Sequence, residues 1–511
     1  MKKITGFIFI TIIGLLPLGC KKFLDVKPMD KLSGNMFWKS PSDVNAFTMD
    51  LYAKFRNKLT STEFMPAVGD LRSGYILPAT INNSNSAAEK AIREVYSKFA
   101  TNDLRSVLST TREWKNLNYS SITKWVDFYQ VIQGANILCD QVDKGVPDLT
   151  DALTKQFHAE GVFLRCLAYF FMVRIYGDVV YYTKAYDQDV HPRENFVDVL
   201  NSCIKELNDY KKYLPLAYSD PAYTAVRATR GAANALLMNM NMWNAGFDKA
   251  NKSRYFQAAA DEGKEIIESN TYKLVSLDEF AQVMKGRSQE GIFEFNQSTN
   301  YEGLPNFRAF FGEIMLKYPE KGAGGDNNSS HAYFKAKFLA RLYPEGQADR
   351  RKDLWFDANM LSETGNFEFL KFKGDIISGA TGAGSIPEWD LIIFRYAGIL
   401  LLRAEALEEL GNNDVEAIKM LNLVRQRAGT ADYSGAGAYQ LSDAIFNERC
   451  KELMGEGQLY FDLVRTGRIM NMEWTDDPLT QSQFDQGAWT WPIDPSALLE
   501  NPSMKLNIYW Q

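Results

Sequence analysis

Apolar residues recur every three or four positions in two runs between residues 395 and 429, and a short polar turn separates the runs. This spacing places the apolar side chains of each run on one face of an α-helix. Gly411 follows the first run, where glycine can adopt the positive φ that ends a helix, and Gly429 follows the second. Asn413 or Asp414 is positioned to cap the second helix. The apolar positions are Tyr396, Leu400, Ala404, Leu407 and Leu410 in the first run and Ala417, Met420, Leu421, Val424 and Ala428 in the second.

Two helices joined by a tight turn are the unit of a tetratricopeptide repeat (TPR), although the connection here is about one residue longer than usual. The small side chains of Ala404 and Ala417 allow the two helices to approach closely. One helix pair cannot bury its apolar face alone, so it needs further pairs stacked against it. The stretch therefore predicts an array of TPR-like helix pairs.

Helical spacing returns in several other segments of the chain. Ser40 and Pro41 stand at the start of one of them, in the order favoured at a helix N-terminus. Together with the pair between 395 and 429, these segments make about four helix pairs, enough for a stable stack. We therefore predict an all-α fold with a scaffold of TPR-like helix pairs. The segments are 41–55, 125–138, 159–170, 227–237 and 255–267.

Two long segments, at about 60–117 and about 274–389, interrupt the helical pattern with polar and turn-forming residues. They predict a loop-rich face on the scaffold, and such loops often carry function. We expect only a few short strands. Residues 291–296 alternate like a strand, and residues 369–372 are a second candidate.

The first loop-rich segment contains residue types that suit sugar binding. Asp70 and Arg72 can form bidentate hydrogen bonds with vicinal hydroxyl groups. Tyr75 and Trp114 offer aromatic faces for stacking against sugar C–H groups. We predict that these four residues bind a ligand. The alternative interpretation is that they form contacts that stabilise the loops.

The second loop-rich segment is rich in aromatic residues, and Tyr301 and Tyr318 are further ligand-binding candidates. The alternative is an apolar cluster beneath a long loop.

Three acidic residues, Glu448, Glu452 and Glu456, fall on one helical face. A glycosidase holds two carboxyl groups about 5–9 Å apart on either side of the scissile bond. Arg449 and Arg465 lie near these acids in the sequence and indicate that the carboxylates are ionised and paired. We therefore predict no catalytic residue and no enzyme activity.

The N-terminus has the pattern of a lipoprotein signal peptide. Two lysines precede an uncharged apolar run over 4–18, which is too short for a membrane-spanning helix. A glycine directly before Cys20 resembles the site at which a cysteine is lipidated. We predict a signal peptide over 1–19, lipidation of Cys20 and one domain over 20–511. The alternative is an ordinary secretory signal with an incidental cysteine.

The formal net charge of −6 argues against nucleic-acid binding, which needs a basic surface. The three histidines, His158, His191 and His331, lie far apart and have no ligand spacing, so we predict no metal site and no cofactor. The four cysteines after Cys20 form no CxxC pair. We expect them to be buried free thiols, with disulfides as the alternative outside the cytoplasm.

Several motifs, in order along the chain, resemble one family. Residues 395–429 contain Arg-Tyr-Ala-x-x-Leu-Leu-x-Arg-Ala-Glu-Ala and Leu-Asn-x-Val-Arg-x-Arg-Ala-Gly. Residues 448–465 contain Glu-Arg-x-x-Glu-Leu-x-Gly-Glu-Gly followed by Asp-Leu-x-Arg, and residues 23–28 read Phe-Leu-Asp-x-x-Pro. Over almost its whole length the chain resembles the SusD/RagB family.

This resemblance implies a non-catalytic lipoprotein, anchored in the outer membrane and facing the cell exterior. It also implies binding of an oligosaccharide and delivery to a SusC-like TonB-dependent transporter. Two alternatives stay open. One is a protein of the same architecture that binds peptides, as RagB-like proteins do, and the other is a surface glycosidase.

Overall fold

A computed structural model describes most of the chain after residue 36. The described residues are 37–61, 64–79, 87–109, 119–297, 311–320, 330–363, 367–374, 376–377, 386–387, 389–411, 413–435, 439–499, 501 and 503–511.

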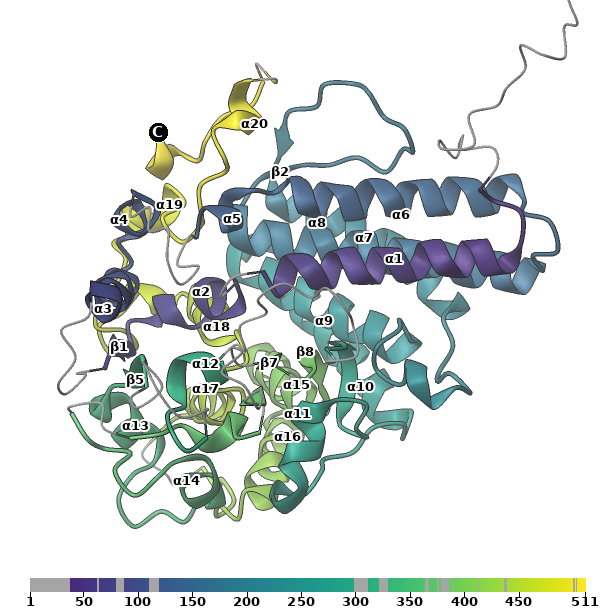
Figure 1. Ribbon diagram of the computed structural model, residues 1–511. Helices are drawn as coiled ribbons and strands as arrows, with labels where there is room; N and C mark the ends of the chain where they lie inside the picture. The colour runs from purple at the N-terminus through teal and green to yellow at the C-terminus, as the bar shows by residue number, and fades with distance from the viewer. Residues whose placement is uncertain are drawn as a thin grey trace, which may run out of the picture.

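The chain folds into a stack of α-helices, in which each long helix packs on the next (Figure 1). The stack runs from α1 through α6, α7, α8, α9 and α10 to α15, which packs against both α16 and α17. Four isolated two-stranded antiparallel sheets occur among the described residues. The predicted all-α fold of TPR-like helix pairs with a few short strands is therefore confirmed.

The α-helices are α1 (Pro41–Leu59), α2 (Phe64–Gly69), α3 (Ala87–Ala100), α4 (Leu104–Ser109), α5 (Ser120–Thr123), α6 (Val126–Lys144), α7 (Asp151–Tyr176), α8 (Phe196–Tyr210), α9 (Arg230–Phe247), α10 (Lys252–Glu268), α11 (Phe280–Lys285), α12 (Phe311–Met315), α13 (Ala336–Leu342), α14 (Arg350–Trp355), α15 (Tyr396–Leu410), α16 (Asp414–Arg427), α17 (Leu441–Glu452), α18 (Leu459–Arg465), α19 (Gln481–Asp485) and α20 (Ser496–Leu499). The strands are β1 (Ile76–Pro78), β2 (Val179–Val180), β3 (Arg193–Glu194), β4 (Gly291–Phe295), β5 (Ala332–Phe334), β6 (Ile376–Ile377), β7 (Ile386–Pro387) and β8 (Leu391–Arg395).

Local sequence signals account for the ends of several scaffold helices. The Ser40 hydroxyl accepts a hydrogen bond from the Asp43 N–H and caps α1, with Pro41 in the first turn. Gly411 ends α15 with a φ of 67°. Asn413 is the N-cap residue of α16, although its side chain makes no capping hydrogen bond.

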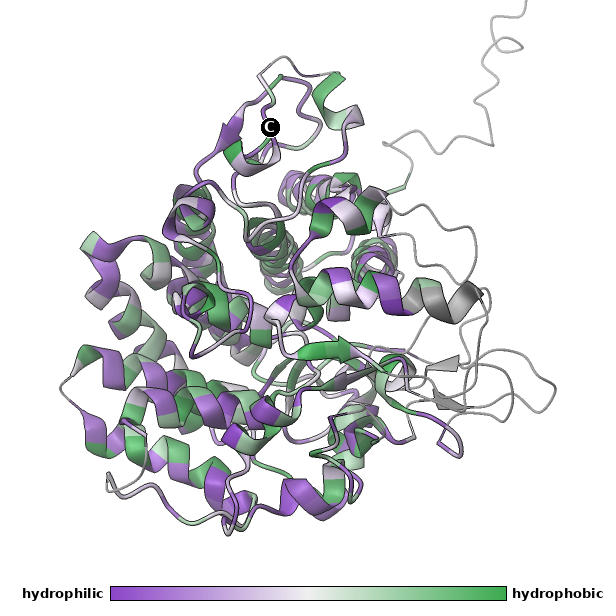
Figure 2. Cartoon of the chain, turned by 90° about the vertical axis from the view of Figure 1, so that its left-hand side faces the viewer, coloured by the Kyte–Doolittle hydropathy of each residue, from purple (hydrophilic) through white to green (hydrophobic). Residues whose placement is uncertain are grey.

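The central helix, α7, is buried on every side over most of its 26 residues. Most other long helices carry a hydrophobic and a hydrophilic face (Figure 2). Because α7 is surrounded, its ionic groups need buried partners. Glu160 of α7 accepts two hydrogen bonds from the Arg227 guanidinium, at 2.7 and 3.0 Å, and a third from the Tyr52 hydroxyl at 3.2 Å.

The strand prediction for residues 291–296 is confirmed by β4, which pairs with β8 and is buried on both faces. The prediction for residues 369–372 is wrong. Phe369 forms a single β-bridge with Phe356, and the chain then enters a 3₁₀ turn over Leu370–Phe372. The buried Phe369 and Phe372 rings contact each other with centroids 5.7 Å apart, so their apolar character reflects core packing.

The first segment predicted to be loop-rich is more regular than expected, because its described residues form α2, β1, α3 and α4. The four cysteines after Cys20 are buried free thiols, as predicted. No helix within the described ranges is long and apolar enough to cross a membrane.

Candidate ligand-binding sites

Asp70 joins two distant parts of the fold instead of facing a ligand. Its side chain is 1% exposed, and its carboxylate accepts hydrogen bonds from the backbone N–H groups of Gly457 at 2.6 Å and Leu459 at 3.3 Å. Burial raises the pKa of Asp70 to about 7, against the lowering effect of these two N–H groups. The prediction that Asp70 contacts a ligand is wrong, because the side chain is enclosed.

Arg72 is also enclosed, with 2% of its surface exposed. Its guanidinium donates to the carbonyl oxygens of Ala488 and Trp489 at 3.1 and 2.9 Å and to the Asn102 side chain at 2.8 Å. It also lies over the Tyr460 ring, 4.3 Å from the centroid. These contacts use the donors that a sugar would need, so the predicted ligand contact of Arg72 is wrong.

Tyr75 is 5% exposed and stacks on Phe338 with ring centroids 4.0 Å apart. Its hydroxyl donates to the carbonyl oxygen of Trp474. The predicted ligand contact of Tyr75 is therefore wrong as well. Asp70, Arg72 and Tyr75 instead form contacts within the fold, which is the alternative interpretation given above.

Tyr318 remains a ligand-binding candidate, since it is 53% exposed and follows α12. The α12 helix is fixed to β5 by a hydrogen bond of 2.8 Å from the His331 N–H to the Ile314 carbonyl oxygen. Trp114, Tyr301 and Cys20 lie outside the described residues, so the predictions for them stand unchanged.

The acidic residues of α17 lie in a buried ionic network. Glu448 accepts hydrogen bonds from Arg351 and Arg425, at 2.5 and 3.3 Å. Glu452 pairs with Arg351 at 3.0 Å, with Arg395 at 2.7 Å, and with Arg427. Glu456, just beyond the helix, pairs with Arg395 at 2.7 Å and with Lys371 at 2.5 Å.

The prediction that these three acids are paired is confirmed, although their partners differ from those expected. Arg449 and Arg465 instead pair with Asp462, at 2.9 and 2.7 Å. Burial alone would raise the pKa of Glu452, but the guanidinium groups of Arg427, Arg395 and Arg351 hold this pKa well below its ordinary value. A buried, ionised and fully paired carboxylate suits neither the acid nor the nucleophile of a glycosidase.

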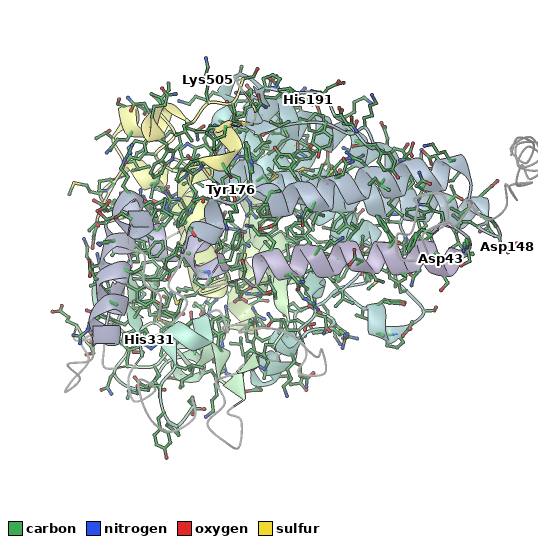
Figure 3. All side chains as sticks on the ribbon, turned by 45° about the horizontal axis from the view of Figure 1, so that its top comes forward. Asp43, Asp148, Tyr176, His191, His331 and Lys505 are labelled. Carbon is green, nitrogen blue, oxygen red and sulfur yellow. The ribbon has the colours of Figure 1, made fainter. Side chains whose placement is uncertain are left out.

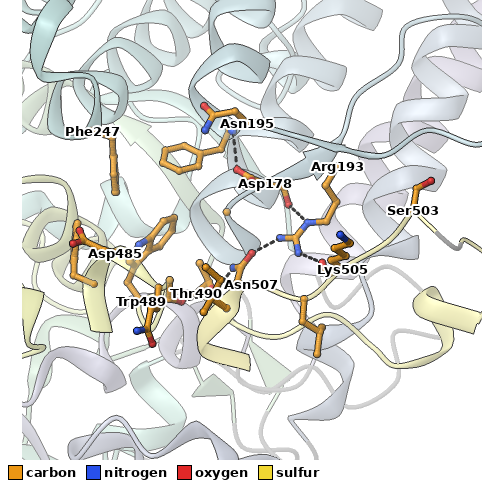
Figure 4. A pocket seen from close by; sticks show the side chains of 17 residues that line it. Asp178, Arg193, Asn195, Phe247, Asp485, Trp489, Thr490, Ser503, Lys505 and Asn507 are labelled. Atoms are coloured by element: carbon orange, nitrogen blue, oxygen red, sulfur yellow. Dashed lines mark hydrogen bonds between the residues drawn. The ribbon is translucent and has the colours of Figure 1, made fainter. Parts of the chain in front are cut away.

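A groove of about 540 Å³ lies where the C-terminal end of α7, the start of α8 and the end of α9 meet the C-terminal segment of the chain (Figure 4). Phe247 and Trp489 line one end of this groove in Figure 4, and Phe484 lies beside Phe247 there. The Phe247 and Phe484 rings are parallel within 10° and have centroids 5.7 Å apart, while Trp489 lies 5.3 Å from Phe247. Polar side chains, including those of Asp178 and Lys505, line the other end.

The framework of the groove is held by Arg193. Its guanidinium donates to the carbonyl oxygens of Tyr176 at 2.8 Å, Asp178 at 2.7 Å and Lys505 at 2.5 Å, and to the Asn507 side chain at 2.7 Å. Arg193 thereby ties the C-terminal segment to the end of α7. The sequence did not suggest this groove, because its walls come from segments about 300 positions apart, and spacing along the chain reports only local neighbours.

A surface loop brings Asp187, Asp189 and His191 together, with ligand atoms within 4.8 Å of one another. The three histidines lie far apart from one another in the sequence, but two aspartates stand close to His191 in this loop. Asp187 already hydrogen-bonds to the Asp189 N–H at 2.9 Å and to the His191 ring at 3.2 Å. The grouping alone therefore does not define a metal site.

The groove and the Tyr318 region lie on different parts of the molecule. Figure 3 shows Lys505 and His191 at the top edge of the molecule, whereas His331, next to α12, lies at the lower left.

Two family profiles match the chain, one described as the SusD family over residues 366–510 and one as starch-binding, associating with the outer membrane, over residues 22–241. A SusD homolog from Bacteroides thetaiotaomicron has 35% sequence identity and a TM-score of 0.82, and the match covers 92% of this chain and 98% of that one. The chain belongs to the SusD/RagB family. SusD-like protein P38 from Formosa agariphila is 24% identical over 99% of this chain and 100% of its own length.

A solved structure described as a laminarin-binding SusD-like protein has a TM-score of 0.69 at 23% identity, and the match covers 92% of this chain and 99% of that one. At this identity the likeness concerns the fold alone. The SusD-like scaffold thus extends over nearly the whole chain, and the ion pair of Arg395 with Glu452 of α17 lies within the segment matched by the SusD family profile.

Proposed function

We propose that this protein is a non-catalytic cell-surface lipoprotein that binds an oligosaccharide and delivers it to a SusC-like TonB-dependent transporter. The match to the SusD homolog along nearly the full length of both chains carries the proposal. The profile described as starch-binding and the laminarin-binding relative support a glycan as the ligand class.

The proposed glycan-binding residues are Tyr318, Trp114 and Tyr301, and of these Tyr318 lies among the described residues. An exposed tyrosine on a segment fixed to β5 can present a flat apolar face without a large loss of conformational freedom on binding. Stacking and hydrogen bonds need no covalent step, so the ligand can be released intact to a transporter.

The absence of enzyme activity is supported by the state of the acidic residues. The carboxylates of α17 are enclosed by arginines and lie away from solvent. Incubation of the protein with mixed polysaccharides is expected to release no reducing ends, and release of oligosaccharides would instead favour a surface glycosidase.

The lipid anchor is tested with Cys20→Ala. We expect the wild-type chain to be recovered in the outer-membrane fraction and to partition into the detergent phase on phase separation. The variant should appear in the aqueous phase, because stable anchoring requires the acyl chains. A variant that still partitions into detergent would favour an incidental cysteine. Protease treatment of intact cells would test the outward orientation, since an exposed protein is degraded without lysis.

Delivery requires a transporter partner. We expect the native protein, purified gently from outer membranes, to co-purify with a TonB-dependent transporter identified by mass spectrometry. Recovery of the protein alone under several mild detergents would contradict this part of the proposal.

The glycan ligand is tested on an oligosaccharide array with the full-length protein, and then with Tyr318→Ala, Trp114→Ala and Tyr301→Ala. Binding should fall in these variants and stay unchanged in Met472→Ala, which removes a side chain that is 73% exposed. Tyr75→Ala is unsuitable, because it would open a hole in the core. Absence of any glycan binding, combined with binding of a peptide library, would favour the RagB-like alternative.

A further inference from the structure

We propose that the groove between the end of α7 and the C-terminal segment is a second sugar-binding site, separate from the Tyr318 face, and that it accepts a neutral pyranose unit. Its volume of about 540 Å³ falls within the range of small-molecule sites.

The aromatic end of the groove offers the apolar contact that a pyranose ring needs. Phe247 and Phe484 are only partly buried although they stack on each other, and the buried Trp489 ring packs against Phe247. Aromatic rings gain stability by covering C–H groups, and a pyranose presents a flat set of C–H groups on one face. One sugar ring placed at this end would cover apolar surface that otherwise faces water.

The polar end offers hydrogen-bonding atoms that the fold does not use. Asp178 accepts one hydrogen bond through Oδ1, from the Phe196 N–H at 3.1 Å, and its Oδ2 has no partner among the described residues. Asn195 Oδ1 caps α8 by accepting from the Val197 N–H at 3.0 Å, but the side-chain N–H group of Asn195 and the ammonium group of Lys505 donate to no partner within the described part of the chain. A carboxylate accepts from hydroxyl groups, whereas an amide N–H and an ammonium donate to them.

The mixture of charges favours a neutral ligand. Asp178 and Asp485 are acidic, and Arg193 and Lys505 are basic, so the lining carries both signs. A hydroxyl group both donates and accepts, so a neutral polyol can satisfy both kinds of side chain without leaving a charge unpaired. A strongly anionic or cationic ligand would meet repulsion at one end of the groove.

The groove is formed before any ligand arrives. Arg193 fixes three backbone carbonyl groups, and the Thr490 hydroxyl accepts hydrogen bonds from Asn507 at 2.8 Å and Trp510 at 3.0 Å. A preformed site loses little conformational entropy on binding, which favours measurable affinity for a small sugar.

The test uses the full-length protein in a detergent without a sugar head group, with maltotriose and laminaritriose as probes. Binding is followed by saturation-transfer NMR and by titration calorimetry in the wild type, Phe484→Ala, Lys505→Ala and Tyr318→Ala. We expect Tyr318→Ala to retain one binding site, detected by saturation transfer to sugar C–H protons. In Phe484→Ala and Lys505→Ala, the affinity of the groove for the sugar should fall about tenfold. Phe484→Tyr should retain binding, because the ring is kept.

Unchanged binding in Phe484→Ala and Lys505→Ala, or loss of all binding in Tyr318→Ala, would overturn the second site. If the Tyr318 face does not bind glycans, Phe484→Ala and Lys505→Ala still test sugar binding in the groove. The two proposals can therefore be refuted independently of each other. Lys505→Ala removes an exposed side chain and keeps the test valid if Phe484→Ala lowers stability. Saturable binding of an aromatic dipeptide amide in the groove, without binding of either trisaccharide, would also overturn the proposal.

Discussion

Arg395 in β8 and Glu452 in α17 are joined by a buried ion pair of 2.7 Å, and Arg395 also donates to the backbone carbonyl oxygen of Glu452 at 2.7 Å. Both side chains are almost fully enclosed. The pair connects the short β4–β8 sheet to the C-terminal helices, so the fold depends on charges held away from water.

We predict that Glu452→Gln lowers the free energy of unfolding by about 3–5 kcal/mol, because three buried guanidinium groups lose a shared counter-charge. Chemical denaturation at pH 7 would measure this loss. Glu268→Gln is the control, since the exposed pair of Glu268 and Lys264 has N and O atoms 3.7 Å apart and should contribute less than about 1 kcal/mol. Equal losses in the two variants would contradict a special role for the network.

The same network predicts acid sensitivity. The arginines hold the pKa of Glu452 below its ordinary value against the effect of burial, so its contribution is complete above the unfolded pKa of about 4.3. The contribution is lost as the pH falls further through the folded pKa. Thermal melts between pH 7 and pH 3 should show a steeper decline for the wild type than for Glu452→Gln, and parallel curves would count against this prediction.

Another prediction concerns Asp70, which bridges α2 to the turn before α18. Asn has one acceptor oxygen where two N–H groups need acceptors, so Asp70→Asn should destabilise the protein by about 1–3 kcal/mol at pH 8. Because burial raises the folded pKa of Asp70 to about 7, the contribution of Asp70 decreases as the pH rises from about 4 to 7. The loss in Asp70→Asn should therefore be larger at pH 5 than at pH 8, and the reverse order would refute the assignment.

A further prediction concerns the buried carboxyl pair of Glu294 and Asp390. Glu294 Oε2 and Asp390 Oδ2 each lack a hydrogen-bond partner among the described residues, and the charge of Asp390 disfavours ionisation of Glu294, so we predict that the pair shares one proton. Burial and mutual repulsion raise the pKa of Glu294, and burial raises that of Asp390 to about 6. Asp390 also accepts from the Gln297 N–H at 2.8 Å.

Because both pKa values are raised on folding, stability should fall as the pH rises through about 6. Glu294→Gln keeps a donor for Asp390 and an acceptor for the Arg287 N–H without titrating. Melting temperatures between pH 5 and pH 9 should therefore be flatter for Glu294→Gln than for the wild type, with the variant the more stable at pH 8. A variant less stable than the wild type at pH 8 would argue against a shared proton.

The helical scaffold could be predicted from the sequence because its signals are local. Apolar spacing, the cap at Ser40 and the glycine at 411 all act within a few residues, and the structure contains the corresponding helices. The failed strand at 369–372 shows the limit of a short apolar run, which can serve a strand or a buried turn equally well.

The burial of Asp70 and Arg72 could not be predicted in this way. Polar residues in a segment of weak periodicity resemble exposed loop residues, but their partners Gly457 and Trp489 lie 387 and 417 positions away. The groove walls were missed for the same reason. Tyr318 is 53% exposed, so its ligand contact stays a prediction that the burial of the other candidates does not affect.

The last prediction tests the close approach that brings Asp70 to its partners. A Cβ atom added to Gly69 would lie 2.4 Å from the Cα and carbonyl oxygen atoms of Gly457, and backbone cannot give way as a flexible side chain can. Gly69→Ala should therefore cost about 1–3 kcal/mol or more. Gly398→Ala is the matched control, because its Cβ would meet only the Leu453 side chain at 3.7 Å within a helix, where Ala is favoured by about 0.5–1 kcal/mol. Chemical denaturation should therefore show a lower free energy of unfolding for Gly69→Ala and a higher one for Gly398→Ala. If Gly69→Ala is tolerated, α2 and the turn at Gly457 can separate, and the hydrogen bonds of Asp70 would contribute little to the fold.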